Sequence, residues 1–201
     1  MTLIEIPKNA DFNSIAALIA NAEVDVAHTL AETLELVVTP DSFLKVDGLA
    51  YLTAWCLELQ RNGCEIKISG DRSNIRYLER MGFHHHLKLI HKGLNESPEV
   101  GRFIPISLIK TGEDVASTVD QICELVIRQF KDGVKFLPAM EWAVNELIDN
   151  IVIHAESPIP GVVCAQSYPQ MNRLEISICD MGRGIRGSLE TTREIESDEE
   201  A

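Results

Sequence analysis

The sequence predicts a chain of α/β and α+β structure, with a small α/β domain over residues 1–95 and an α/β sandwich over residues 101–201. In the first part, strand-like and helix-like runs alternate, which is typical of a small parallel or mixed sheet. In the second part, two long amphipathic runs precede a pair of alternating strands, which is typical of helices packed on one face of a sheet. Gly, Asn, Ser and Pro cluster over residues 92–103 and favour a joint there.

The periodicity of the first part predicts helices and strands in alternation. The helices lie near residues 13–23, 46–63 and 73–83, and the strands over residues 32–40 and 64–70. In the second strand, Ile66 and Ile68 alternate with polar residues. Gly63 suits the C-terminal end of the second helix, and Ser73 suits the N-cap of the third.

The second part is predicted to open with a strand and to end with a β-hairpin. Its elements are a strand over residues 102–109, helices near residues 113–131 and 137–155, and hairpin strands over residues 161–168 and 173–180. The apolar face of the second helix should pack on the sheet, and it consists of Met140, Ala143, Val144, Leu147, Ile148, Ile151 and Ala155. Glu141, Asn145 and Asp149 should point mostly away from the sheet.

Composition and charge narrow the class of protein. No apolar run approaches the roughly 18 residues that span a bilayer, and the first residues lack the basic and apolar regions of a signal peptide. The five cysteines form no CxxC pair, which favours reduced thiols in a cytoplasmic protein with no membrane association. The net charge of −13 argues against direct nucleic-acid binding, because phosphates require Lys and Arg.

The stretch "NELIDNIVIHA" places a row of polar residues on the second long helix. Glu146, Asn150 and His154 are four residues apart, so they form a ridge along one margin of the apolar stripe, neither in the deep core nor fully in solvent. A carboxylate at that margin can act as a general base, and an amide oxygen suits Mg²⁺ that already carries phosphate oxygens and water. The alternative is an amphipathic helix with ordinary polar residues at its boundary.

A second motif, "DMGRGI", follows the last predicted strand. Its two glycines, Gly182 and Gly184, allow a tight turn and a close approach of the backbone to a ligand. Asp180, at the end of the strand, can accept a hydrogen bond from an exocyclic amine. The alternative is a simple turn with a capping aspartate.

Together, the two motifs resemble the nucleotide-binding motifs of the GHKL ATPase superfamily, which includes histidine kinases, gyrase-type ATPases and anti-sigma-factor serine kinases. The resemblance covers roughly residues 100–190, and the helix is most similar to the anti-sigma-factor kinases. The resemblance implies that ATP and Mg²⁺ are bound. Glu146 would be the general base, Asn150 would coordinate Mg²⁺, and His154 would line the phosphate side.

The same resemblance assigns the second motif to the adenine. Asp180 would bind the adenine amino group. Gly182 and Gly184 would shape the pocket, and Ile185 would complete the motif at the start of the lid.

The sequence departs from the superfamily after this motif, because no second glycine-rich phosphate motif follows it. Two explanations stay open. The chain is a fragment of a longer protein, or its ATPase domain is truncated and binds nucleotide weakly or not at all. In either case, an uncovered sheet edge would favour association, including formation of a homodimer.

Residues 30–90 resemble, more weakly, the STAS domains of anti-sigma-factor antagonists. The resemblance lies in "LELVVTP", "FLKVDGLAYLTAW", "CEIKISG" and "YLERMGFHHHL". Antagonists carry a phosphorylated serine before a glycine, and in this sequence Asp47 stands in its place. Asp47 is either a fixed negative charge at a regulatory helix N-terminus or a plain capping acid. The run from His84 to His86 is expected at the start of a strand, with metal binding as the alternative.

The two resemblances imply an ATP- and Mg²⁺-binding regulatory ATPase or serine/threonine protein kinase of the anti-sigma-factor type, acting in bacterial signalling. A sigma factor or a STAS-type antagonist would be its protein partner. The alternative is a non-catalytic protein interaction module, built from a STAS-like domain and a degenerate ATPase domain.

Overall fold

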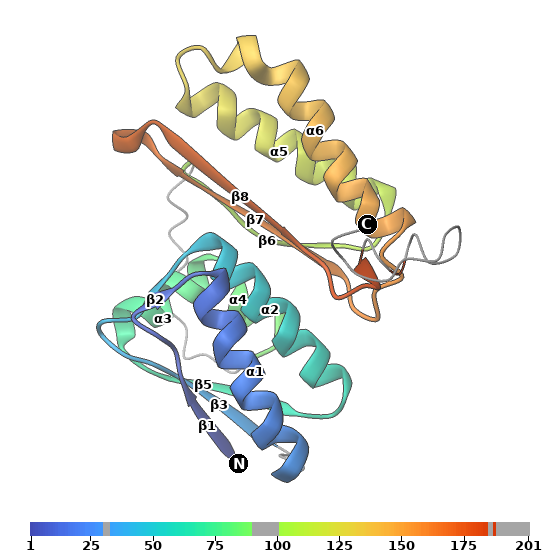
Figure 1. Ribbon diagram of the computed structural model, residues 1–201. Coiled ribbons are helices and arrows are strands. Elements are labelled where there is room, and N and C mark those ends of the chain that lie inside the picture. Colours follow the sequence, from blue (N-terminus) through green and yellow to red (C-terminus); the bar gives the residue numbers. More distant parts are fainter. Residues whose placement is uncertain (30–32, 90–100, 185–186, 188–201) are drawn as a thin grey trace.

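The computed structural model of the protein describes residues 1–29, 33–89, 101–184 and 187, and only the backbone of residues 23–29. Its elements form four layers in the order sheet, helices, sheet, helices (Figure 1). The mixed α/β class predicted from the sequence is confirmed. Within the described residues, no helix combines the length and the apolar character that crossing a membrane requires.

The first sheet is fully parallel and has the strand order β1-β3-β5. Its strands are β1 (Thr2–Glu5), β3 (Thr33–Val38) and β5 (Glu65–Gly70), and a separate two-residue bridge joins β2 (Asn9–Ala10) to β4 (Phe43–Leu44). The predictions of β3 and β5 are confirmed, and of the two predicted kinds of sheet, parallel or mixed, the structure has the parallel one. Strand β1 was not predicted, and it is a four-residue edge strand with a single buried side chain, Ile4.

Helices α1 (Phe12–Thr29) and α2 (Val46–Arg61) lie on the face of the first sheet that is turned toward the second sheet (Figure 1). Helices α3 (Arg72–Arg80) and α4 (Phe83–His86) follow β5. Ser73 is not the N-cap of α3, because Asp71 occupies that position and accepts hydrogen bonds from the backbone nitrogens of Ser73 and Asn74. The histidine run is not at a strand start, because it forms the short helix α4.

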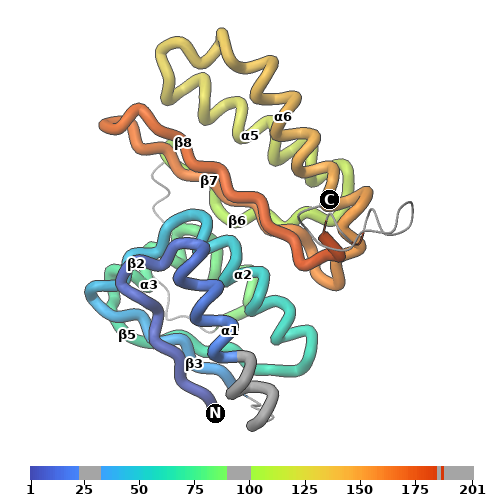
Figure 2. The backbone as a smooth tube through the Cα atoms, viewed as in Figure 1, coloured from blue at the N-terminus to red at the C-terminus, as the bar shows by residue number. Residues whose placement is uncertain are grey.

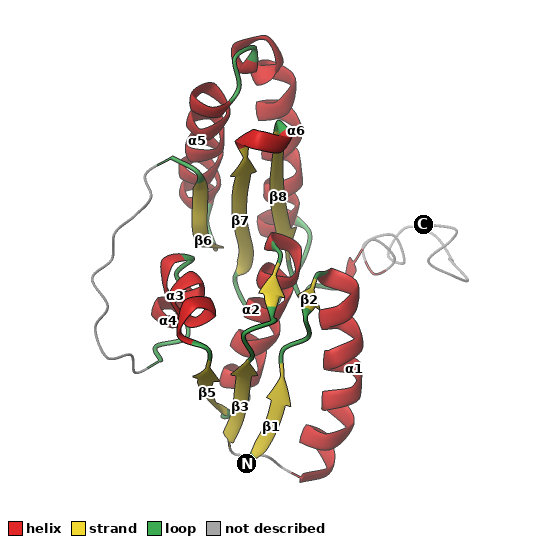
Figure 3. Ribbon diagram, turned by 90° about the vertical axis from the view of Figure 1, so that its left-hand side faces the viewer, coloured by secondary structure: helices red, strands yellow, loops and turns green. Residues whose placement is uncertain are grey.

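The second sheet is antiparallel and has the strand order β6-β7-β8. Its strands are β6 (Phe103–Ile109), β7 (Gly161–Tyr168) and β8 (Arg173–Cys179), with the short 3-10 helix η1 (Pro169–Met171) between the last two. Helices α5 (Gly112–Gln129) and α6 (Gly133–Ile153) cover one face of this sheet, as predicted (Figure 3). Helix α6 begins four residues before the predicted start, and Pro138 lies inside it.

Helix α2 packs between the two sheets. Most of its first ten residues are buried, both those that face the first sheet and those that face the second. Trp55, in the middle of the helix, is 2% exposed. The thiol of Cys164 on β7 donates a hydrogen bond to the carbonyl oxygen of Val46 at 3.5 Å. One hydrophobic core therefore contains residues from both parts of the chain, including Leu36 from β3 and Val162 from β7.

A second, smaller core lies between the antiparallel sheet and the helix pair. Ile122 of α5 and Ile148 of α6 pack there against Val163 of β7. Successive side chains of β7 point alternately into the two cores, so both faces of this strand are buried. The antiparallel sheet is thus the layer that joins the two predicted domains.

Candidate functional site

The packed face of α6 is rotated relative to the prediction. Val144, Ile148 and Ile151 are buried as expected, but Leu147 is 55% exposed. Asn145 and Asp149, which were expected to point away from the sheet, are partly buried, and the Asn145 amide donates a hydrogen bond to Asp149 at 2.8 Å. The prediction was wrong for these three residues because the helix contacts α5 as well as the sheet, and this second contact turns the buried face.

Glu146, Asn150 and His154 are all exposed, so their prediction as half-buried margin residues was wrong. Their side chains have no hydrogen bond or ion pair with any other residue that the structure describes. The three side chains follow the same side of α6 over about 12 Å, given the rise of about 1.5 Å per helical residue. They are therefore accessible to a ligand and are not consumed by structural contacts.

The turn after β8 packs against the C-terminal end of α6. Gly182 lies so close to Ala155 that a Cβ on the glycine would be 2.2 Å from the Ala155 carbonyl oxygen. The Ala155 carbonyl oxygen also accepts a hydrogen bond of 2.9 Å from the backbone nitrogen of Arg183. The two sequence motifs therefore meet in space, through a backbone contact that only glycine allows at position 182.

Asp180 and Gly184 shape the same turn. One carboxylate oxygen of Asp180 accepts a hydrogen bond of 2.8 Å from the backbone nitrogen of Gly182, which is the capping interaction expected of a simple turn. Its other carboxylate oxygen has no partner among the described residues. Gly184 has a φ of +68°, a conformation that favours glycine. Ile185 lies outside the described residues, so its predicted role stays a prediction.

Arg183 is a site residue that the sequence analysis missed. Its guanidinium donates a hydrogen bond of 3.2 Å to the backbone oxygen of His154 and forms an ion pair of 3.1 Å with Glu156. A cation at this place is favourable because the carbonyl groups at the C-terminus of a helix carry partial negative charge. A basic residue between two glycines just after a strand is the signal that could have identified it.

The residue before the turn, Cys179, is an unreactive thiol. Burial, together with the neighbouring Asp180 carboxylate, raises the pKa of Cys179 to about 12. A thiol with this pKa stays protonated near neutral pH and is a poor nucleophile. The chemistry of the site therefore depends on the carboxylates, the amide and the imidazole rather than on this cysteine.

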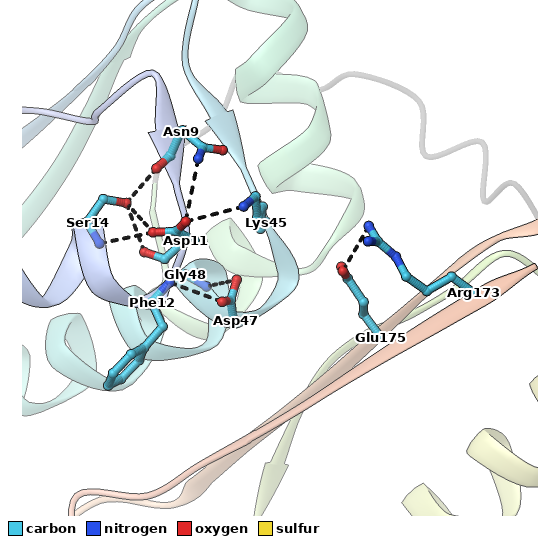
Figure 4. Close-up of polar contacts among 9 residues, drawn as sticks. All are labelled: Asn9, Asp11, Phe12, Ser14, Lys45, Asp47, Gly48, Arg173 and Glu175. Atoms are coloured by element: carbon cyan, nitrogen blue, oxygen red, sulfur yellow. Dashed lines mark hydrogen bonds and ion pairs between the residues drawn. The ribbon is translucent and has the colours of Figure 1, made fainter. Parts of the chain in front are cut away.

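Asp47, in the first turn of α2, accepts hydrogen bonds from the first turns of two helices. Its carboxylate accepts hydrogen bonds from the backbone nitrogen of Phe12 at 3.1 Å and from that of Gly48 at 2.8 Å (Figure 4). Gly48 is required at this place, because a Cβ there would lie 2.0 Å from the Ala10 carbonyl oxygen. Lys45 occupies the N-cap position of α2 and makes no side-chain cap bond. Asp47 therefore satisfies backbone N–H groups from within the first turn, which favours a plain structural acid over a regulatory charge.

The histidine run does not form a metal site in the structure. Across residues 1–22, 33–89 and 101–184, the His, Cys, Asp and Glu side chains form no group of three or more that could hold a metal ion. The Nε2 atom of His86 lies 2.7 Å from the backbone oxygen of Ile106, so this ring links α4 to the second sheet. His84 is buried and His85 is exposed, so the three rings face different surroundings.

Comparisons with protein-family models, with curated proteins and with solved structures found no match for the chain.

Proposed function

We propose that the second half of the chain binds ATP together with Mg²⁺ and acts as a regulatory ATPase or serine/threonine kinase of the anti-sigma-factor type in bacterial signalling. The observation that carries this proposal is the contact between Gly182 and Ala155. This contact places the turn after β8, which contains Asp180 and Gly182, at the C-terminal end of α6, the helix that carries Glu146 and Asn150. Two motifs that resemble the halves of one nucleotide site thus lie side by side.

The residues of the site fit the chemistry that this proposal requires. One carboxylate oxygen of Asp180 has no partner among the described residues, and in this proposal it accepts a hydrogen bond from the adenine amino group. The Asn150 amide is exposed, and its oxygen can complete a Mg²⁺ shell made largely of phosphate oxygens and water. When bound, Mg²⁺ neutralises the charge of the phosphate groups.

Glu146 lies one helical turn before Asn150 on α6, so its carboxylate can take a proton from a water molecule or a hydroxyl group near the phosphates. Arg183 holds the backbone of the turn against the end of α6 and keeps Asp180 in place relative to the helix. The regulatory partner in this proposal is a sigma factor or a STAS-type antagonist, which follows from the resemblance and not from a contact in the structure.

Fluorescence titration with mant-ATP, in the presence and absence of Mg²⁺, tests the proposal. Saturable, Mg²⁺-dependent binding is expected. Asp180→Asn should weaken it about tenfold or more, because a hydrogen bond to a charged group is lost. Asn150→Ala should remove the Mg²⁺ dependence. Glu141→Gln changes an exposed acid elsewhere on α6 and is the matched control.

Glu146→Ala separates binding from turnover. The variant should bind mant-ATP like the unchanged protein and should lose phosphate release or phosphoryl transfer, because the general base is gone. Turnover that survives this change would reject Glu146 as the base. The absence of any saturable nucleotide binding to the unchanged protein would reject the proposal as a whole.

One structural feature favours a second function, that of a non-catalytic interaction module. Large apolar side chains are exposed along α6, among them Phe136, Trp142, Leu147 and Ile153. Such concentrations of exposed apolar residues mark protein interaction sites. Analytical ultracentrifugation of the protein, alone and with mant-ATP, distinguishes the two functions, because the module requires association without nucleotide binding.

A further inference from the structure

A cavity of about 340 Å³ opens at the junction between the two parts of the chain. It lies between helix α3 of the first part and the strands β6 and β7 of the second, with η1 at its mouth. A volume of this size is at the lower end of the range of small-molecule sites. Its lining includes Tyr77, Arg80, Arg102, Gln166, Tyr168 and Met171.

The cavity is far from the proposed nucleotide site. In the hairpin, Val162 pairs with Cys179 at the end near Asp180, whereas Tyr168 pairs with Arg173 at the other end. Figure 2 shows the closed end of this hairpin well away from the C-terminal end of α6. A ligand in this cavity would therefore be separate from the proposed nucleotide.

The lining of the cavity is basic in a strongly acidic protein. Two arginines, Arg80 and Arg102, line it, and among the described residues that line it there is no aspartate or glutamate. This is notable because the chain contains 31 acidic residues and 18 basic ones. The two arginines come from different parts of the chain, and both are exposed, so each can reach a ligand at the mouth of the cavity.

The two phenols in the lining are neutral. Burial raises the pKa of Tyr77 well above its ordinary value, and its hydroxyl donates a hydrogen bond of 3.1 Å to the side-chain oxygen of Gln166. Burial and the nearby Glu175 carboxylate raise the pKa of Tyr168 to about 12. Glu175 itself pairs with Arg173 at 2.9 Å, so its charge is balanced.

Gln166 is oriented by Tyr77 so that it can donate. Because its oxygen accepts from the Tyr77 hydroxyl, its amide nitrogen remains as a donor without a partner in the described part of the chain. The cavity thus presents two guanidinium groups and one amide donor. Phe103, Pro169 and Met171 supply apolar walls beside them.

We propose that this cavity binds a small organic oxyanion, in which a phosphate or carboxylate group is attached to an aromatic or aliphatic body. The guanidinium groups would hold the oxyanion through charge-assisted hydrogen bonds, and the apolar walls would cover the body. Because residues of both parts line the cavity, such a ligand also bridges α3 and the antiparallel sheet.

NMR titration of the ¹⁵N-labelled full chain with phenyl phosphate and with benzoate tests this proposal. Both probes carry an anionic group on an aromatic ring, and the tighter one identifies the preferred head group. The side-chain NH₂ signals of Gln166 should shift in a saturable way. The backbone signals of Gly182 and Gly184 should stay in place, which separates this site from the proposed nucleotide site. Benzyl alcohol, which is neutral, should produce no saturable shift.

Two variants and a control make the result specific. Arg102→Gln and Arg80→Gln should each weaken the binding of the tighter probe about fivefold or more, because a charge-assisted pair is lost. Arg76→Gln removes an exposed arginine from the same helix outside the cavity and should leave the affinity unchanged. The proposal is overturned if neither probe saturates by about 10 mM, a very weak affinity. It is equally overturned if all three variants bind alike.

Discussion

Gly182 and Ala155 approach each other so closely that no side chain fits between them, since a Cβ on the glycine would lie 2.2 Å from the Ala155 carbonyl oxygen. This contact ties the end of β8 to the end of α6. It is the point at which the two sequence motifs become one place in the molecule, and the proposed nucleotide site depends on it.

Replacing Gly182 by alanine should displace this turn. The added methyl group meets backbone atoms that cannot move away cheaply, so we expect a loss of about 1–3 kcal/mol in unfolding free energy and of nucleotide binding. Gly184→Ala meets no atom of the described residues within 4 Å and should cost about 1 kcal/mol, through its positive φ. Urea unfolding measures both changes.

Gly112→Ala is the matched control for these glycine substitutions. Gly112 has open space around it and begins α5, so alanine should be neutral or slightly stabilising there. If Gly182→Ala were as harmless as this control, the close contact between the turn and α6 would be contradicted.

Trp55 should couple the stability of the two parts of the chain, because α2 packs between both sheets. Trp55→Ala removes a fully buried indole and should cost about 3–5 kcal/mol. Trp142→Ala removes an indole that is 69% exposed and should change the unfolding free energy by less than about 0.5 kcal/mol.

Circular dichroism and tryptophan fluorescence should report one unfolding transition for the unchanged protein, because the shared core opens as a unit. Two separate transitions, of which Trp55→Ala shifts only the earlier one, would show that the two parts unfold independently.

Thr111 should set the start of α5. Its hydroxyl accepts a hydrogen bond from the backbone nitrogen of Asp114, and the Asp114 carboxylate accepts one of 2.9 Å from the Thr111 nitrogen, which forms a reciprocal capping box. Thr111→Ala should therefore cost about 1 kcal/mol in urea unfolding. Thr111→Ser keeps the hydroxyl and should be nearly neutral. If the two variants lost the same unfolding free energy, the missing methyl group, and not the missing hydroxyl, would be the cause.

His86 should make the stability of the protein depend on pH. Burial lowers the pKa of His86 below its unfolded value of 6.5, so the folded state favours the neutral ring. The contribution of His86 to stability is then complete above pH 6.5, and it declines as the pH falls below that value, because the unfolded chain takes up the proton first.

The variant His86→Gln isolates this effect, because an amide can keep the contact with the Ile106 oxygen and does not titrate. The difference in unfolding free energy between the unchanged protein and the variant should be constant above about pH 7. Between pH 6.5 and 5, the unchanged protein should lose more stability than the variant. A constant difference over the whole range would contradict a titrating His86.

The sequence by itself predicted the elements whose hydrophobic period is long and regular. Helix α2, strands β3 and β5 and the β7–β8 hairpin all occur close to the predicted residues, because their side chains alternate or recur with the period of one local structure. The position of a glycine also predicted the end of a helix, since Gly63 follows α2 with a φ of +91°. Strand β1 escaped prediction because a short edge strand has too few side chains to show a period.

Only the tertiary structure decided which faces of these elements meet. Period alone could not show that α2 is buried on two sides, nor that contacts with α5 turn Leu147 outward and Asp149 inward. The contact of Gly182 with Ala155 and the basic cavity near Arg102 likewise join residues that are distant in the chain. The physical reason is that local sequence determines the backbone period of an element. The rotation of that element and its neighbours follow from packing all layers together.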